Sequence, residues 1–178
     1  ELRWSFQSGG WILGRPAVTD RHVVIGSQDK QMYCLEKQTG KVIWKLGTGS
    51  RVETGASIHN GIVYFCSCDG NLYSVEIHTG KSLWKFSADP RREDRPSPIY
   101  SVPIITDEAV YFAAGEGQVY SVDRATGKLL WKIRPSESSE LFSSLATDGR
   151  RLFVTSRPKI RDVEGEHGIF AIGETNDR

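Results

Sequence analysis

A sixteen-residue pattern occurs three times in this chain and constrains its fold more than any other feature. The copies run from Asp29 to Trp44, from Asp69 to Trp84 and from Glu116 to Trp131. Each contains a tyrosine, then Thr-Gly followed by lysine, and finally a tryptophan. Each copy therefore predicts one strand that carries the tyrosine, a tight turn at Thr-Gly, and a second strand that carries the tryptophan.

The tryptophans set the length of the full repeat. Trp4, Trp44 and Trp84 are evenly spaced along the chain, and Trp131 follows after a somewhat longer interval. A period of roughly 40 residues that holds four short strands is typical of a β-propeller blade. Apolar residues alternate with period two, and no window shows a helical apolar stripe. We predict an all-β chain, a β-propeller of about four four-stranded blades in which residues 1–178 form a single domain.

Each period is predicted to contain an inner strand, a second strand, the tyrosine strand and an outer tryptophan strand. The inner strands are predicted at Ala17-Val18, Ser57-Ile58, Ile104-Ile105 and Leu145-Ala146, and the second strands at His22–Gly26, Ile62–Ser67, Ala109–Ala114 and Arg151–Ser156. Asp69-Gly70 predicts a two-residue type I′ hairpin turn. The glycine of each Thr-Gly pair predicts a left-handed backbone conformation.

The last period differs from the others at its end. Gly168–Ile172 reads as its tyrosine strand, with Phe170 in the tyrosine position, and no outer strand follows. Leu2–Phe6 reads as an outer strand with no blade before it. We predict that Leu2–Phe6 completes the last blade and closes the ring, which removes two open sheet edges. The alternative is that two copies pair into an eight-bladed ring, so the chain is predicted to be a monomer or a homodimer.

Charge and hydropathy exclude two classes of partner. The net charge is +1, from 23 basic and 22 acidic residues. This balance provides no electrostatic footprint for nucleic acid or for an anionic membrane surface. No stretch approaches the roughly 18 apolar residues that a membrane-spanning helix requires. We therefore expect no nucleic-acid partner and no membrane span.

The cysteines predict neither a disulfide scaffold nor a metal site. Cys34, Cys66 and Cys68 are odd in number, and the last two would lie on the same side of one strand, poorly placed to pair. Only His59 and His78 are plausible further ligands by sequence. We predict three buried free thiols and no metal ligand.

The pattern Gly-x-x-Tyr-x-x-Asp-x-x-Thr-Gly-x-x-x-Trp resembles the repeat of the pyrroloquinoline-quinone-like (PQQ-repeat) propellers. Gly117–Trp131 fits it most closely, and Glu36 and Glu76 stand where that copy has Asp123. The resemblance implies that the tryptophans pack between neighbouring blades. It also implies a periplasmic or extracellular location, because relatives with this repeat are often exported. The repeat is shared by quinoprotein alcohol dehydrogenases, a barrel-assembly lipoprotein of the outer membrane, and domains of unassigned role.

A quinoprotein dehydrogenase is expected to have eight blades, adjacent cysteines over the cofactor, a calcium site and an aspartate base. This chain has about four blades, and Ser67 separates Cys66 from Cys68. It also lacks the G-x-S-x-G, P-loop and H-E-x-x-H motifs. We predict a chain that is not an enzyme, with no catalytic, cofactor-binding or metal-binding residue. The alternative is a domain that binds a quinone such as pyrroloquinoline quinone with calcium, complete only within a larger or dimeric eight-bladed ring.

Binding residues are expected where the periods do not repeat. The segments around the starts of the inner strands differ from period to period, and they would meet at one mouth of a propeller, near its axis. The candidate partner-binding residues in these segments are Trp11, Arg15, Arg51, Glu53, Tyr100 and Phe142. Aromatic and arginine side chains are enriched at binding hot spots. We predict a scaffolding propeller that holds a protein or peptide through this mouth and the loop of residues 89–100; the alternative is that these side chains fill a narrow central channel.

Overall fold

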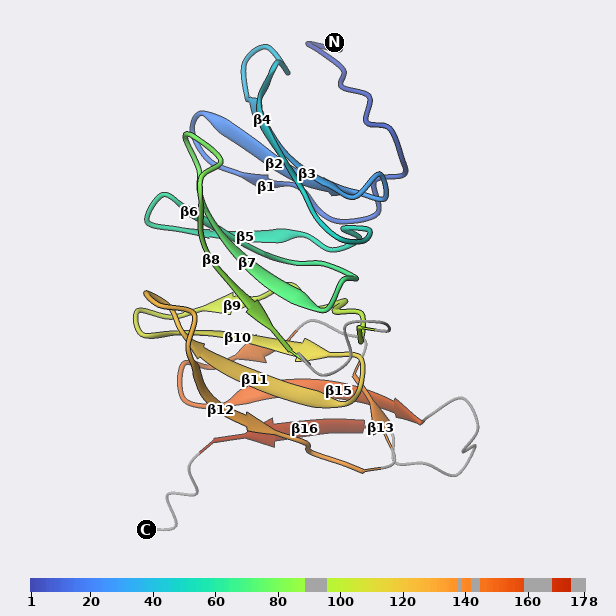
Figure 1. Cartoon of the computed structure of the whole chain (residues 1–178), viewed down its shortest axis with the longest axis vertical. Helices are drawn as coiled ribbons and strands as arrows, with labels where there is room; N and C mark the ends of the chain where they lie inside the picture. Colours follow the sequence, from blue (N-terminus) through green and yellow to red (C-terminus); the bar gives the residue numbers. More distant parts are fainter. Residues whose placement is uncertain (89–95, 138, 142–144, 159–167, 174–178) are drawn as a thin grey trace. The chain divides into compact units, whose positions relative to one another are not determined.

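The computed structural model describes residues 1–88, 96–137, 139–141, 145–158 and 168–173. All regular secondary structure in these ranges is β-strand, and the strands form four four-stranded antiparallel sheets (Figure 1). The chain divides into two compact units, Glu1–Pro98 and Ile99–Arg178. The all-β, four-sheet prediction is confirmed.

The first unit contains two sheets of the same design. The strands of the first sheet are β1 (Ala17–Val18), β2 (His22–Ser27), β3 (Gln31–Glu36) and β4 (Val42–Gly47), and those of the second are β5 (Ala56–His59), β6 (Ile62–Cys66), β7 (Asn71–Glu76) and β8 (Ser82–Ser87). In both sheets the strands lie side by side in chain order. This is the order predicted from the repeat, from the inner strand outward to the tryptophan strand.

The second unit contains one sheet that matches the repeat and one that departs from it. Its strands are β9 (Ile104–Ile105), β10 (Ala109–Ala114), β11 (Gln118–Asp123) and β12 (Leu129–Ile133), then β13 (Ser139–Glu140), β14 (Ala146–Thr147), β15 (Leu152–Pro158) and β16 (Gly168–Ile172). In the last sheet β13 pairs with the end of β15, β14 pairs with its beginning, and β16 pairs with β15 as well. The sequence predicted β14 and missed β13, which is only two residues long.

The predicted closing strand is extended chain without strand pairing. No strand is assigned to Leu2–Phe6, and the part of the chain that is described gives this segment no sheet partner. Its side chains are nevertheless placed, because Trp4 and Phe6 pack against a cluster that includes Tyr33 and Leu35. Closure of the ring by this segment stays a prediction.

The turn prediction at Asp69-Gly70 is wrong. Only Gly70 has a positive φ there (+76°), and the turn is closed by the amide of Gly70, which donates to the carbonyl of Ser67 (3.1 Å). The type I′ geometry occurs instead at Asn60-Gly61, where φ is +48° and +76° and where the turn joins β5 directly to β6.

The Asp69 loop is longer than a two-residue turn because its carboxylate bonds to three groups. Asp69 accepts hydrogen bonds from the hydroxyl of Tyr73 (2.6 Å) and from the amides of Gly49 (2.8 Å) and Asn71 (3.1 Å). Asp29 makes the corresponding set in the preceding period. Burial, with the hydrogen bond and the charge of Asp29, raises the pKa of Tyr33 to about 12. In these two periods the acidic residue that opens the repeat therefore ties the tyrosine strand to the segment after the preceding outer strand.

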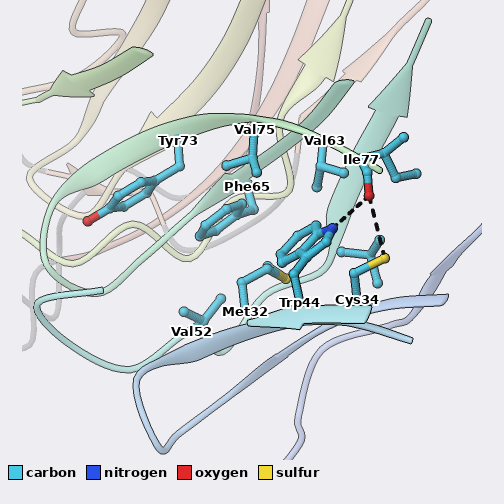
Figure 2. Packing of buried hydrophobic residues seen from close by; sticks show 10 residues of the cluster. Met32, Cys34, Trp44, Val52, Val63, Phe65, Tyr73, Val75 and Ile77 are labelled. Carbon is cyan, nitrogen blue, oxygen red and sulfur yellow. Dashed lines mark hydrogen bonds between the residues drawn. The ribbon is translucent and has the colours of Figure 1, made fainter. Parts of the chain in front are cut away.

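Trp44 occupies the centre of the core between the first and second sheets (Figure 2). It is 8% exposed and packs with Met32, Val63 and Phe65. Its indole Nε1 donates to the carbonyl oxygen of Ile77 at 2.6 Å. An outer-strand tryptophan thus packs against the next blade, as the resemblance implied.

The Thr-Gly turn supports the same indole. Gly80 has φ +73°, and a Cβ built on it would fall 2.7 Å from Cγ of Trp44. The left-handed backbone predicted for these glycines is confirmed, at +72° for Gly40 and +70° for Gly127. Trp131 is 37% exposed, much more than Trp44. The turn that would support it, at residues 175–176, lies outside the described residues.

Candidate functional site

The six predicted binding residues are distributed over both units. Trp11, Arg15, Arg51 and Glu53 belong to the first unit, and Tyr100 belongs to the second. Phe142 and residues 89–95 of the predicted loop lie outside the described residues. The geometry given below is therefore that of the first unit alone.

Three of the four residues in the first unit are brought together by Gln28, which directly follows β2. The backbone N–H of Gln28 donates to the backbone carbonyl of Trp11 (2.9 Å), and the side-chain Nε2 of Gln28 donates to Oε1 of Glu53 (2.6 Å). Glu53 also forms an ion pair with Arg51, with 3.2 Å between Nη1 and Oε1. The described contacts do not join Arg15, which is exposed, to this group.

Sequence reasoning missed Gln28, although a signal was present. Position 28 corresponds to Cys68 in the next copy and to Gly115 in the third, so it varies between periods. The acidic residue that follows it is kept as Asp29, Asp69 and Glu116. A position that varies between periods, next to an acidic residue in every copy, is the same kind of signal as the variable segments before the inner strands.

The backbone beneath the ion pair is fixed by both sheets. The amide of Val52 donates to the carbonyl of Ser27 (3.1 Å), and the amide of Cys68 donates to the carbonyl of Arg51 (2.9 Å). The side chain of Val52 is fully buried. Because backbone hydrogen bonds hold the segment on both sides, Arg51 and Glu53 project from a well-determined position.

The side chains before β1 form an exposed apolar patch. Trp11 is 74% exposed and Leu13 is 59% exposed, and Ile12 between them is exposed as well. We call these three residues the Trp11 patch. Half of the Arg51 side chain is exposed, whereas its partner Glu53 is mostly buried. The first unit therefore presents an aromatic and aliphatic patch and, joined to it through Gln28, a guanidinium group that is open to solvent.

The described residues offer little for covalent or metal chemistry. They contain no group of three or more His, Cys, Asp or Glu side chains that could hold a metal ion. All three cysteines are buried and free, and burial raises the pKa of the Cys34 thiol to about 12. A thiol with so high a pKa stays protonated at neutral pH and is a poor nucleophile. No helix long and apolar enough to cross a membrane occurs in the described ranges.

His22 and His78 form a ring contact between the first and second sheets. Their ring centroids are 5.1 Å apart, and Nδ1 of His22 lies 3.2 Å from the hydroxyl of Thr19. His22 is buried, and this burial, with the positive charges that His78 and Arg21 can carry, lowers its pKa.

This contact predicts a loss of stability at mildly acidic pH. Between the lowered pKa of His22 and the unfolded value near 6.5, the native state binds fewer protons than the unfolded state, so the free energy of unfolding should fall as the pH is lowered through that window. Urea unfolding at pH 7.5 and pH 5.5 measures the loss, which should be smaller in His22→Gln. His59→Gln, in β5, serves as the control and should retain the loss of the parent chain. Equal losses in the parent and in His22→Gln would contradict the assignment.

Comparison with known proteins places this geometry in a family. The family model described as outer membrane protein assembly factor BamB matches residues 1–161. No curated protein sequence matches the chain significantly.

Solved structures share the fold at low sequence identity. BamB from Moraxella catarrhalis superposes with a TM-score of 0.73 at 20% identity, covering 86% of this chain and 46% of that one. The computationally designed Ika4 protein gives 0.74 at 21% identity, with 94% of each chain covered. A quinohemoprotein alcohol dehydrogenase from Comamonas testosteroni gives 0.76 at 17% identity, covering 92% of this chain and 33% of that one.

The chain thus spans about half the length of the BamB that it matches. The repeats, the four antiparallel sheets and the outer tryptophan that packs on the next blade agree with the family match, which covers most of the sequence. The chain belongs to the BamB family of PQQ-like β-propeller proteins.

Proposed function

We propose that this chain is a non-catalytic binding propeller that holds a protein or peptide partner at the Trp11 patch and Arg51. The observation that carries the proposal is a large indole left 74% exposed on a segment whose backbone is hydrogen-bonded to the end of β2. Exposed apolar patches rimmed by polar groups are typical of interaction sites. An assembly factor, as BamB is named, acts on other proteins, which supports a protein partner here.

Preorganisation gives the patch its expected affinity. Gln28 holds the Trp11 segment and Glu53 at once, so a partner would order few additional groups when it binds. Arg51 is paired on one side and half exposed on the other, which leaves N–H donors for a carboxylate or a backbone carbonyl of the partner. The partner segment that fits is apolar, with an acidic or carbonyl group beside it.

The family name suggests where the partner resides. The family is named for the assembly of outer membrane proteins. We therefore propose an extracytoplasmic location and a partner that takes part in that assembly.

A photo-crosslinking amino acid placed at position 11 tests the proposal. In the cells that make the protein, we expect one discrete protein adduct from position 11 and none from position 130, where Leu130, 53% exposed, is another exposed apolar residue on β12. Trp11→Ala should then weaken binding of the captured partner by about 30-fold, the effect of a hot-spot residue worth roughly 2 kcal/mol. Leu130→Ala should change neither the affinity nor the melting temperature.

Two outcomes would contradict the proposal. One is equal crosslinking from positions 11 and 130, which would mean that the patch is not a specific site. The other is a rise in melting temperature of the purified chain on addition of pyrroloquinoline quinone and calcium, which would favour the small-molecule alternative.

A further inference from the structure

The turn that joins β5 to β6 contains the only Asn-Gly pair in the sequence, Asn60-Gly61. The strand pairing brings His59 opposite Ile62, so the two turn residues lie outside the ladder, and both are exposed. The backbone nitrogen of Gly61 is therefore not held by the hydrogen bonds between β5 and β6. This leaves it available for reaction with the neighbouring Asn60 side chain.

An asparagine side chain can react with the backbone nitrogen of the residue that follows it. The nitrogen attacks Cγ, the new N–Cγ bond closes a cyclic imide, and the Cγ–Nδ2 bond breaks to release ammonia. Water then adds to either carbonyl of the imide, which leaves aspartate or isoaspartate. The first step is intramolecular, and glycine favours it because no Cβ crowds the attacking nitrogen. Water is the only reactant that the chain does not supply.

The surroundings of Gly61 leave room for such a ring. A Cβ built on this glycine would meet no atom within 4 Å. The glycine of the Thr-Gly turn, Gly80, has nearly the same φ but lies against the Trp44 ring. The Asn60 turn is therefore open where the Thr-Gly turn is packed, and an imide can form there without displacing a neighbouring side chain.

His59 lies beside the leaving group of this reaction. Its Nε2 is 3.1 Å from Nδ2 of Asn60. Nδ2 must gain a proton before it leaves as ammonia, and an imidazole within hydrogen-bond distance can deliver that proton. Solvent accepts the proton lost by the Gly61 nitrogen and returns one to His59, so the step as a whole releases neutral ammonia.

Asn71 is the other asparagine in the described ranges, and it lacks these features. It lies in β7 opposite Ser87, and the residue that follows it, Leu72, is fully buried. Its backbone N–H and its Nδ2 both donate to Asp69, each at 3.1 Å. The strand pairing and the buried leucine hold this backbone in place, so Asn71 provides an internal comparison that should react slowly.

We propose that Asn60 is a site of spontaneous deamidation, with the backbone nitrogen of Gly61 as the nucleophile and His59 as the proton donor to the leaving group. The products at position 60 are aspartate and isoaspartate. This modification site lies in the turn between β5 and β6 and is independent of the partner site at the Trp11 patch.

The two products affect the fold differently. Aspartate keeps the length of the backbone and adds one negative charge, and Asp-Gly also favours a type I′ turn. Isoaspartate places an extra methylene in the main chain, which a two-residue turn cannot accommodate in the same register. The carbonyl of Gly61 accepts from the backbone N–H of Ile77 (2.9 Å), and the carbonyl of Ile77 accepts from the Trp44 indole. Isoaspartate therefore disturbs the residue that anchors Trp44.

Incubation of the purified chain at pH 7.5 and 37 °C tests the site. We expect peptide mass spectrometry to show conversion of the amide to the acid at position 60 and not at Asn71. An isoaspartyl methyltransferase with labelled S-adenosylmethionine should label the converted chain, and the label should map to position 60. Equal conversion of Asn60 and Asn71 would overturn the proposal. So would an Asn60 that stays intact in the folded chain while it converts in urea.

Two variants separate the nucleophile from the proton donor. Gly61→Ala should slow conversion about tenfold, both in the folded chain and in urea, because the added methyl group crowds the attacking nitrogen. His59→Gln should slow conversion roughly tenfold in the folded chain and leave the rate in urea unchanged, because the contact with Nδ2 exists only in the folded turn. An unchanged rate in folded His59→Gln would overturn the role of His59.

The isoaspartate form, separated from the parent chain by chromatography, tests the effect on the fold. Its melting temperature should be lower than that of the parent chain, because the longer main chain displaces the carbonyl that Ile77 contacts. Asn60→Asp adds the charge without the methylene and should melt close to the parent. Equal melting temperatures of the isoaspartate form and Asn60→Asp would contradict the link from the turn to Ile77.

Discussion

Replacing Trp44 with alanine should lower the free energy of unfolding by about 3–5 kcal/mol, as measured by urea denaturation. The indole is 8% exposed and packs between two sheets, so its removal opens a cavity that neither sheet can fill alone. The carbonyl of Ile77 also loses its indole donor. A loss of this size is a large part of the roughly 5–15 kcal/mol that stabilises an ordinary domain.

Trp11→Ala is the matched control for this experiment. The same side chain is removed, but from a position where it is 74% exposed, so the free energy of unfolding should change by no more than about 0.5 kcal/mol. Similar losses in the two variants would mean that Trp44 does not hold the two sheets together. The contrast also separates stability from binding, since Trp11→Ala is expected to affect only the latter.

Gly80→Ala should destabilise the chain by roughly 2–5 kcal/mol, as the sum of a left-handed backbone strain of about 1–2 kcal/mol and an overpacking cost of about 1–3 kcal/mol. The strain arises because φ is +73° at this position. The overpacking arises because the added Cβ would lie 2.7 Å from Cγ and 2.8 Å from Cδ2 of Trp44. Thermal or urea unfolding measures the total.

Gly61→Ala isolates the first of these two costs. Gly61 has φ +76°, almost the same as Gly80, but no atom lies within 4 Å of a Cβ built on it. It should therefore show the backbone strain alone, about 1–2 kcal/mol. Equal losses of unfolding free energy in the two variants would show that the glycine of the Thr-Gly turn is needed only for its left-handed backbone, and not to leave room for the Trp44 indole.

The strands could be predicted from the sequence because the repeated periods can be aligned with one another. Where copies agree, as at Tyr33 and Tyr73, alternation and turn residues place the elements within a residue or two. The type I′ turn predicted at Asp69-Gly70 was wrong because it was inferred only from the local backbone preference of the Asp-Gly dipeptide. The conformation is set instead by hydrogen bonds from Tyr73 and Gly49 to the Asp69 carboxylate, and one of these comes from a segment 20 residues away.

The candidate site was predictable in its residue types and not in its connections. Trp11, Arg51 and Glu53 were chosen because their segments vary between periods, and the structure joins the three through Gln28. No local pattern contains that link, since Gln28 and Glu53 are 25 residues apart. The hydrogen bond from Trp44 to Ile77 could not be read from a local pattern either, because the two residues are 33 apart in the sequence. Only the family resemblance implied that this tryptophan packs against the next blade.

The position of the tryptophan determines what part of this chain is a transferable unit. A single sheet, such as residues 17–47, carries Trp44 but not the turn on which its indole rests, because that turn belongs to the following sheet. A segment from one outer strand through the next Thr-Gly turn, such as residues 42–80, holds both halves of the contact. When blades are duplicated, deleted or exchanged, boundaries placed just before an outer strand should therefore preserve the packing. Boundaries placed at the borders of a sheet should break both the hydrogen bond from the indole to the next sheet and the packing of the indole on the next Thr-Gly turn.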